Sequence, residues 1–219
     1  MRPIVLLGPT AAGKTRLAIE MAKILKGEII SADSMQVYRG MDIGTAKPTI
    51  EERQGIPHHL IDIRDPDESW TVSDFIRETQ ALTIKIHHRG KVPIIAGGTG
   101  LYLWSLLEGF AFPITPADKE LRARLENEPA SALYGRLSTI DPKAADKIHP
   151  NDKKRIIRAL EVYELTGKPI SELQGKKKVE SRAPNTEHRI LIGLNLPREE
   201  LYSRINQRVD SMIEKGLIE

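Results

Sequence analysis

Short runs of apolar residues alternate, along the first half of the chain, with segments in which apolar residues recur every three or four positions. Runs of the first kind are typical of buried strands and occur at residues 3–7, 28–32 and 92–96, with a shorter one at 59–63. The second pattern predicts amphipathic helices at 14–25 and 71–89. Such an alternation predicts an α/β fold, in which helices cover both faces of a parallel sheet.

Polar residues and glycines mark the ends of these helices. Thr71 and Asp74 have the spacing of a capping box, and Gly90 is placed to end the helix that they begin. Gly27 is expected to end the earlier helix. Residues 39–58 are rich in Gly, Pro and Thr and predict a long ordered loop.

The pattern changes after residue 114. Only helical segments are found from there to residue 181. The clearest is 151–166, with Asn151 as its cap and Gly167 at its end. We therefore expect an all-helical domain at 115–188, inserted into the sheet domain.

The sheet domain resumes near the end of the sequence. Strand character returns at 189–196, and 197–215 predicts a final helix. Four apolar residues of this helix are expected to face inward: Leu201, Ile205, Val209 and Met212. Residues 1–114 and 189–219 together should then form the core of the fold.

Composition narrows the class of protein. Hydrophobic residues make up 40% and charged residues 29%, as in ordinary globular proteins, and no apolar run approaches the ~20 residues of a membrane span. We expect a cytoplasmic protein that does not enter a membrane. The absence of cysteine excludes disulfides, thiolate metal sites and cysteine nucleophiles.

Positive charge is concentrated in one internal block. The net charge is only +3, but residues 143–189 hold 12 Lys and Arg against 7 Asp and Glu. The clusters in this block are Lys153, Lys154, Arg155 and Arg158, followed by Lys176, Lys177 and Lys178. This distribution suggests a polyanionic partner, although a solvated helical surface would have the same composition.

A glycine-rich loop follows the first strand and opens the first helix. It matches G-x-x-x-x-G-K-[ST] without a mismatch and consists of Gly8, Pro9, Thr10, Ala11, Ala12, Gly13, Lys14 and Thr15. Its backbone N–H groups and the helix N-terminus attract phosphate oxygens. Lys14 supplies a cation, and the Thr15 hydroxyl is placed to hold Mg²⁺. This P-loop predicts binding of a di- or triphosphate, as in nucleotide- and ATP-binding proteins, but leaves the reaction open.

Other polar residues are weaker candidates. Asp33 follows the second strand, at the edge where open α/β sheets bind ligands. An acidic residue there can assist Mg²⁺ or act as a general base, and it can equally cap a turn with Ser34. Asp62 is interpreted as part of a turn rather than as a Walker B-like aspartate. The histidine pairs at 58–59 and 87–88 are not expected to bind a metal, because adjacent side chains point apart.

Several stretches taken together resemble the tRNA dimethylallyltransferase family, also called tRNA isopentenyltransferases. These stretches are the P-loop and residues 31–38 (SADSMQVY), 40–48 (GMDIGTAKP), 97–102 (GGTGLY) and 149–152 (HPND). The resemblance runs from residue 2 to residue 219. Members of this family are usually longer, so we expect the C-terminal part of the family chain to be absent from this sequence.

The resemblance implies transfer of a dimethylallyl group from dimethylallyl diphosphate to the exocyclic amine of the adenosine 3′-adjacent to the anticodon in tRNA. The P-loop would hold the diphosphate leaving group with Mg²⁺, and Lys14 would stabilise its charge. The family's general base corresponds to Asp33. Thr10 and Arg208 correspond to family positions that contact the diphosphate.

The resemblance also implies a surface for the tRNA anticodon stem-loop. The family's tRNA contacts correspond to Asp33, Ser34, Met35, Gln36, Thr99, Arg122, Lys154, Arg155, Ile156, Ile157 and Arg158. The helical insertion would bind phosphates, and the target base would leave its stack to reach the diphosphate substrate. The resemblance implies action as a monomer.

Three alternatives use the same loop. A P-loop small-molecule kinase would explain the loop, the sheet and a helical insertion, but not the specific stretches at 33–38 and 42–48. An isopentenyltransferase acting on a free adenine nucleotide would have little use for a positive helical domain. A nucleic-acid-binding module with a non-catalytic anion site is the third.

Overall fold

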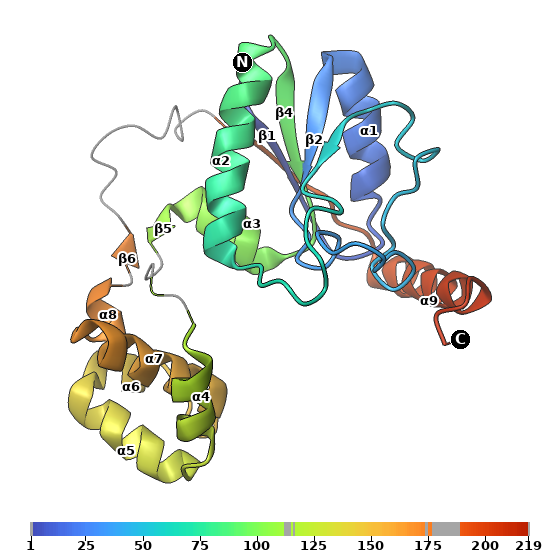
Figure 1. The fold of residues 1–219 in the computed structure, drawn as a ribbon. Coiled ribbons are helices and arrows are strands. Elements are labelled where there is room, and N and C mark those ends of the chain that lie inside the picture. Colours follow the sequence, from blue (N-terminus) through green and yellow to red (C-terminus); the bar gives the residue numbers. More distant parts are fainter. Residues whose placement is uncertain (1, 112–114, 116, 174, 177–188, 219) are drawn as a thin grey trace. The chain divides into compact units, whose positions relative to one another are not determined.

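The computed structural model describes residues 2–111, 115, 117–173, 175–176 and 189–218. The chain divides into two compact units. Residues 1–107 and 181–219 form the first, which we call the sheet unit, and residues 108–180 form the second, which we call the helical unit. Each is described by itself (Figure 1).

The sheet unit is built on five parallel strands in the order β3-β2-β4-β1-β7. These strands are β1 (Ile4–Leu7), β2 (Gly27–Ser31), β3 (His58–His59), β4 (Val92–Ala96) and β7 (Ile190–Gly193). The prediction of an α/β fold with a parallel sheet is confirmed. The strand expected at 59–63 is only two residues long, because Leu60 and Asp62 adopt left-handed backbone conformations, with φ of 62° and 57°.

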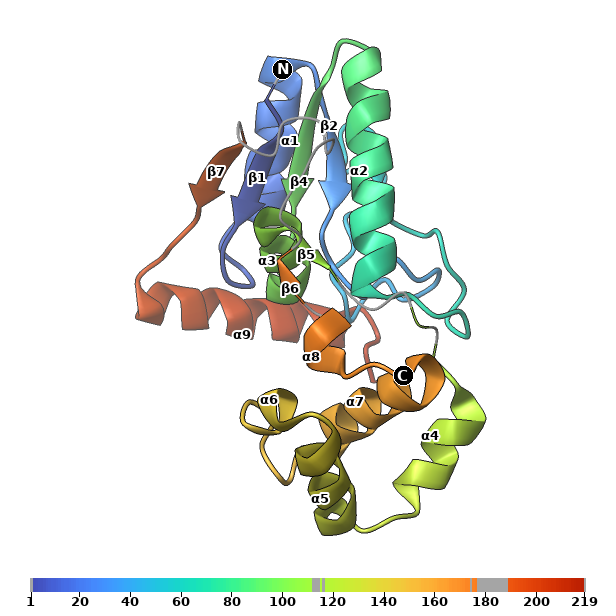
Figure 2. The same cartoon turned by 90° about the vertical axis from the view of Figure 1, so that its left-hand side faces the viewer.

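Helices cover both faces of this sheet (Figures 1 and 2). They are α1 (Lys14–Leu25), α2 (Val72–His88) and α3 (Gly100–Glu108), whereas α9 (Arg198–Glu214) lies across the carboxyl end of the strands. Alternate strand residues point to opposite faces. Ile4 and Ile94 therefore pack with α1, whereas Val5 and Ile95 pack with α2 and α3. Within the described residues, no helix has both the length and the apolar composition needed to cross a membrane.

The helix ends agree with the sequence in part. The capping box of α2 is present, since the Thr71 side chain accepts from the Asp74 N–H and the Asp74 side chain accepts from the Thr71 N–H. The predicted bounds of α1 are confirmed, but Lys26 and not Gly27 takes the left-handed cap conformation. The inward apolar stripe expected on α9 is present only in part, because Leu201, Ile205 and Met212 are half-buried. None of its residues is buried, and Val209 is 44% exposed.

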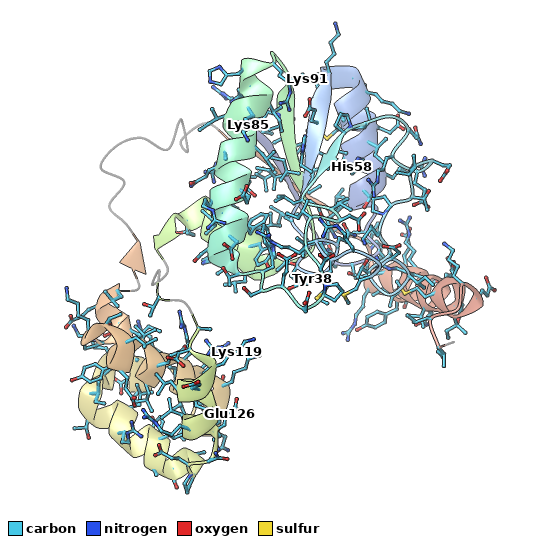
Figure 3. All side chains as sticks on the ribbon, viewed as in Figure 1. Tyr38, His58, Lys85, Lys91, Lys119 and Glu126 are labelled. Atoms are coloured by element: carbon cyan, nitrogen blue, oxygen red, sulfur yellow. The ribbon has the colours of Figure 1, made fainter. Side chains whose placement is uncertain are left out.

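A buried carboxylate on β2 links this strand to β3 and to the start of β4, at the amino end of the sheet. Glu28 of β2 is 2% exposed and accepts hydrogen bonds from His59 Nε2 at 2.7 Å and from Arg89 Nη2 at 2.5 Å, while Lys91 Nζ lies 3.0 Å from its Oε1. Burial alone would raise the pKa of Glu28, but these hydrogen bonds outweigh it and lower the pKa to about 2. Figure 3 shows Lys91 at the end of the sheet opposite to Tyr38.

The helical unit has its own hydrophobic core. Its elements are β5 (Phe110–Ala111), α4 (Lys119–Glu126), α5 (Ala130–Ile140), α6 (Pro142–Ala145), α7 (Lys153–Thr166), α8 (Ile170–Leu173) and β6 (Gly175–Lys176). Leu125, Leu133, Ile156 and Leu160 lie at its centre.

Two details of the helical unit differ from the expectation. Strands β5 and β6 pair antiparallel. β6 lies where the sequence indicated helices alone, since a two-residue strand leaves no detectable periodicity, and β5 lies in the part that was predicted to belong to the core. Asp152, and not Asn151, caps α7, since its side chain accepts from the Arg155 N–H. Lys177 and Lys178 of the predicted basic loop lie outside the described residues.

Candidate functional site

The P-loop connects β1 to α1 through three residues with positive φ. Gly8 and Gly13 have φ of 153° and 88°, and Ala11 is also left-handed, at 62°. A Cβ at Gly8 would lie 2.6 Å from the Leu194 carbonyl oxygen, so a glycine is required where the chain leaving β7 passes. Backbone N–H groups at the start of α1 are consequently available for an anion.

Two residues of this loop present hydroxyl groups. Thr10 and Thr15 are both exposed, and Thr15 lies in the first turn of α1. Within the described residues, no group of three or more His, Asp or Glu side chains is arranged to hold a metal. Any Mg²⁺ here would therefore take most of its ligands from phosphate oxygens and water, with Thr15 as the protein ligand. The exposed hydroxyl group of Thr15, in the first turn of α1, is suited to be that one ligand.

Lys14 lies over the loop and close to two other charged groups. Its Nζ donates to the carbonyl oxygens of Gly8 at 2.8 Å and of Pro9 at 2.6 Å. Burial is the main cause that lowers the pKa of Lys14, and the positive charge of Arg208 lowers it further, whereas Asp33 raises it. The fold thus brings the predicted diphosphate cation, the predicted base and Arg208 to one edge of the sheet.

Asp33 forms the turn that was one of the roles the sequence left open. Its Oδ1 accepts from the N–H groups of Met35 at 2.9 Å and Gln36 at 3.3 Å, which builds the turn after β2. Within the described residues, its Oδ2 makes no hydrogen bond. One oxygen therefore shapes the loop, and the other is available to accept a proton.

The turn at Asp33 is attached to the turn that follows β4. The Ser34 N–H donates to Thr99 Oγ1 at 3.0 Å, and the Thr99 N–H donates to the Ala32 carbonyl at 3.2 Å. A Cβ at Gly97 would lie 2.2 Å from the Ala32 oxygen, so only glycine permits this close approach. The five sheet-unit residues predicted to contact tRNA are thereby brought together: Asp33, Ser34, Met35, Gln36 and Thr99.

Arg208 reaches this site from the last helix. It is half-buried, and its Nη2 donates to the Thr45 carbonyl oxygen at 3.3 Å. The same oxygen accepts from Gln36 Nε2 at 3.3 Å. Figures 1 and 2 show α9 lying across the carboxyl end of the strands, which explains how a residue so late in the sequence reaches the P-loop region.

Two features near this site were not predicted from the sequence. Lys47 is nearly buried and bonds to Asp42 and Asp62, whereas its segment was interpreted as a loop and as one of the stretches that carry the resemblance. Tyr102 is buried and stacks on Phe75 at 4.5 Å. Burial above all raises the pKa of Tyr102 to about 12, so its hydroxyl keeps its proton at neutral pH. Tyr102 could have been suspected, because it follows the glycine-rich turn directly, whereas nothing in the local sequence indicates that Lys47 is buried.

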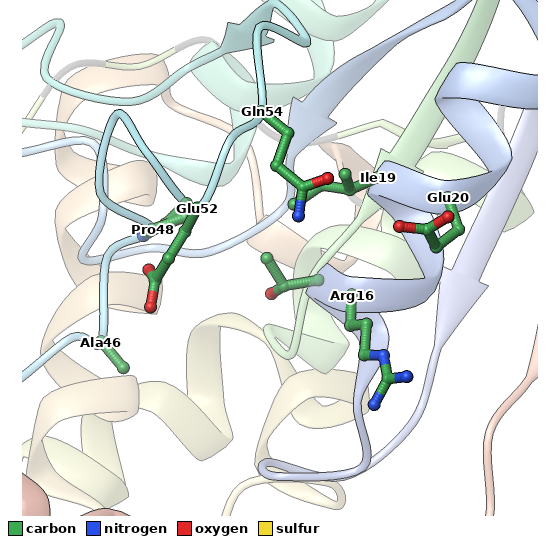
Figure 4. A pocket seen from close by; sticks show the side chains of 8 residues that line it. Arg16, Ile19, Glu20, Ala46, Pro48, Glu52 and Gln54 are labelled. Atoms are coloured by element: carbon green, nitrogen blue, oxygen red, sulfur yellow. The ribbon is translucent and has the colours of Figure 1, made fainter.

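A pocket opens beside the P-loop, between α1 and the long loop (Figure 4). Its volume is about 340 Å³. The residues that line it are Thr15, Arg16, Ile19, Glu20, Ala46, Pro48, Glu52 and Gln54. The pocket adjoins the Thr15 side of the phosphate loop.

The helical unit carries the remaining predicted tRNA residues. Lys154 and Arg155 are exposed at the start of α7, whereas Ile156 and Ile157 are buried in the core of the unit. Arg122 and Arg158 are held by the buried Glu161. Arg122 Nε and Nη2 each donate to it at 2.8 Å, and Arg158 Nη1 donates at 2.6 Å. Their role in tRNA binding stays a prediction.

Sequence comparison finds a family and close relatives. A model of the family described as IPP transferase matches residues 36–219. The chain is 50% identical to the tRNA dimethylallyltransferase of Halalkalibacterium halodurans, over 99% of this chain and 69% of the relative. It is 51% identical to that of Caldanaerobacter subterraneus subsp. tengcongensis, over 99% and 70%.

Solved structures agree with these relatives. The full-length tRNA isopentenylpyrophosphate transferase of Bacillus halodurans matches with a TM-score of 0.64 and 48% identity, covering 99% of this chain and 67% of that one. A eukaryotic dimethylallyltransferase acting on tRNA matches with a TM-score of 0.78 and 33% identity, covering 99% of this chain and 54% of that one.

Proposed function

This chain belongs to the IPP transferase family, and we propose that it transfers a dimethylallyl group from dimethylallyl diphosphate to the exocyclic amine of the adenosine 3′-adjacent to the anticodon in tRNA. The observation that carries the chemical proposal is that the turn bearing Asp33 and the P-loop lysine meet at the turn after β4. The Thr99 N–H donates to the Ala32 carbonyl at 3.2 Å, and a Cβ at the neighbouring Gly98 would lie 4.0 Å from Lys14 Nζ. A base and a cradle for diphosphate then face the same space. Prenyl transfer to an amine needs both.

Lys14 and the P-loop act on the leaving group. The carbon–oxygen bond of the allylic diphosphate breaks, and the electron pair leaves with the diphosphate. Lys14 Nζ, the loop N–H groups and Arg208 lie where they can stabilise this negative charge. Mg²⁺ held by Thr15 and the diphosphate oxygens would supply further charge neutralisation. Thr10, exposed on the loop, would contact the same group.

Asp33 acts on the nucleophile. The adenine amine is a poor nucleophile because its lone pair is delocalised into the ring. As the nitrogen–carbon bond forms, the nitrogen loses a proton, and Asp33 Oδ2 would accept it. Because Oδ1 is fixed by the N–H groups of Met35 and Gln36, the carboxylate is held in one orientation for this transfer.

The helical unit would bind the anticodon stem-loop through phosphates. Lys154 and Arg155 are exposed at the N-terminus of α7, where the helix dipole also favours an anion. Arg122 and Arg158 would contribute from their ion pairs with Glu161. We propose that the protein acts as a monomer in the cytoplasm, where its tRNA substrate is found. A single species at the monomer mass, free and with tRNA, would support this.

The decisive assay incubates the chain with radiolabelled dimethylallyl diphosphate and unmodified tRNA. We expect label in the tRNA, at the adenosine beside the anticodon. Label that appears only on free AMP would indicate the free-nucleotide enzyme, and phosphate transfer from ATP to a small acceptor would indicate a kinase. If this chain and one extended to the length of its relatives both bind tRNA without any transfer, the protein would be a nucleic-acid-binding module.

A further inference from the structure

Lys47 is a buried cation for which the reaction described above has no role. Its side chain is 4% exposed. Its Nζ donates to Asp42 Oδ1 at 2.5 Å, to Asp62 Oδ1 at 2.6 Å and to the Tyr38 carbonyl oxygen at 2.8 Å. All three protons of the ammonium group are therefore used. Since an unpaired buried charge is costly, such a complete set of partners indicates a constructed site rather than a solvated surface lysine.

The three partners of Lys47 lie on two segments at the carboxyl end of the strands, beside the candidate site. Asp42 and Tyr38 belong to the loop after β2, whereas Asp62 belongs to the segment after β3. Backbone hydrogen bonds also join these segments, from the Asp62 N–H to the Gln36 carbonyl at 3.2 Å and from the Ile63 N–H to the Val37 carbonyl at 2.9 Å. Lys47 adds a buried ionic link between the two segments.

Backbone strain is concentrated in the same two segments. Ala46, Leu60 and Asp62 all have positive φ, at 46°, 62° and 57°. Non-glycine residues keep this conformation only where the surrounding contacts impose it. Two of the three are Asp62, which binds Lys47 directly, and Ala46, its neighbour in the chain. The Lys47 ion pairs are thus among the contacts that impose the strained path.

Thr45, two residues before Lys47, connects the two halves of the site. Its carbonyl oxygen accepts from Gln36 Nε2 and from Arg208 Nη2, each at 3.3 Å. Gln36 belongs to the turn predicted to contact tRNA, and Arg208 belongs to the diphosphate side. The orientation of the Thr45 carbonyl follows from the path of residues 41–47, which Lys47 closes by returning to Asp42.

We propose that Lys47 is a positioning residue, which fixes the Thr45 carbonyl so that Arg208 is held at the diphosphate and Gln36 at the adenosine side. The proposal rests on the proposed function, because it assigns Arg208 to the leaving group. Lys47 itself touches no substrate. Its removal should therefore act through Arg208 and not by a separate route.

The test is a double-mutant cycle with Lys47→Met and Arg208→Ala in the full chain. We expect Lys47→Met to lower kcat for prenyl transfer by about tenfold to a hundredfold, as loss of a supporting contact commonly does. Arg208→Ala should then add no more than about a further twofold in the Lys47→Met background. Independent effects that multiply would overturn the proposal, and so would Lys47→Met activity equal to that of the parent.

Two variants guard against a folding defect. Asp42→Asn weakens the same site from a side chain that is 63% exposed. The loss of activity caused by Arg208→Ala should therefore be smaller in the Asp42→Asn background than in the parent. Lys47→Arg keeps the charge and should recover part of the lost activity. Lys23→Met is the matched control, because it removes an exposed lysine paired with Glu20 at 3.1 Å, and its activity should equal that of the parent. An Asp42→Asn variant in which Arg208→Ala keeps its full effect would contradict the proposal.

Binding separates this proposal from the proposed function. Calorimetry with dimethylallyl diphosphate measures the same cycle without tRNA and without turnover. Non-additive losses of affinity in Lys47→Met and Arg208→Ala would support the role of Lys47 even if the chain transferred nothing to tRNA. Additive losses, with normal transfer by the parent chain, would reject Lys47 and leave the proposed function intact.

Discussion

Lys14 at the start of α1 and Arg208 on α9 lie close enough for their positive charges to interact, although they come from opposite ends of the chain. Burial lowers the pKa of Lys14, and Arg208 lowers it further. Two positive charges placed close together repel each other. Such an arrangement is expected where a multiply charged anion binds. We therefore expect a bound diphosphate to relieve the repulsion between them.

Replacing Asp33 by asparagine should stop the chemistry and spare binding. The amide oxygen of the new side chain can still accept from the Met35 and Gln36 N–H groups, so the turn should persist. Without a base, we expect prenyl transfer to fall by about 10² to 10⁴. Single-turnover transfer and tRNA binding are measured side by side. Asp65→Asn, at an exposed carboxylate, is the control, and near-normal turnover by Asp33→Asn would exclude Asp33 as the base.

The lowered pKa of Lys14 predicts a pH dependence of diphosphate binding. The ammonium group loses its proton at a lower pH than an ordinary lysine, whose pKa is 10.5. As the pH rises, the affinity for inorganic diphosphate should therefore begin to fall before the pH reaches 10.5. Lys14→Arg should lack this decline, because arginine stays charged. Calorimetry from pH 7 to 10.5 compares the two, and identical profiles would show that Lys14 is not the titrating group.

Glu28→Gln should destabilise the sheet unit in a pH-dependent way. At neutral pH the hydrogen bonds to this buried carboxylate stabilise the fold, and the lowering of its pKa from 4.5 to about 2 corresponds to about 3 kcal/mol, which Glu28→Gln should lose. Since the folded pKa is about 2 and the ordinary value is 4.5, this stability is present above pH 4.5 and is lost as the pH falls toward 2. The difference between parent and variant should shrink over that range.

Urea unfolding followed by tryptophan fluorescence measures this effect, because Trp70 and Trp104 both lie in the sheet unit. The matched control is Glu68→Gln, which breaks an exposed pair with Arg64 and should cost less than about 1 kcal/mol. A pH-independent difference for Glu28→Gln would show that its charge does not stabilise the fold.

Gly97→Ala should disturb the site through its backbone. The added Cβ would lie 2.2 Å from the Ala32 oxygen and force apart the turns that carry Asp33 and Thr99. We expect a loss of about 1 to 3 kcal/mol in stability, with a larger fall in transfer than stability alone explains. The control is Gly135→Ala in α5, where a Cβ meets nothing within 4 Å and should be stabilising. Unchanged transfer by Gly97→Ala would refute this close approach.

Lys154→Ala and Arg122→Ala should weaken tRNA binding for different reasons. Lys154 is exposed, so its loss should reduce the slope of log affinity against log salt by about one and leave the melting temperature unchanged. Arg122→Ala removes a partner of the buried Glu161 and should destabilise the helical unit by about 3 kcal/mol. Filter binding at several salt concentrations and circular dichroism separate the two. An unaltered salt slope in Lys154→Ala would remove it from the tRNA surface.

The sequence by itself determined the elements of the fold and the phosphate loop. The apolar runs at β1 and β4 are clear because both faces of each strand are buried, and the periodicities of α1 and α2 are clear because each helix buries one face. The P-loop is local, so its residues can be recognised within one segment. The family also followed from sequence, since its specific stretches are contiguous.

Only the tertiary structure decided how distant residues meet. The Lys47 ion pairs, the shared Thr45 carbonyl and the contact of Gly97 with Ala32 each join segments that no periodicity relates. For Asp33 the structure decided between alternatives that the sequence had left open, because Oδ1 builds a local turn while Oδ2 accepts no hydrogen bond from the described part of the chain. Periodicity reports which face of one element is buried, whereas a site depends on where the ends of several elements come together. Arg208 therefore acquired its place beside Lys14 only through the packing of α9 across the strand ends.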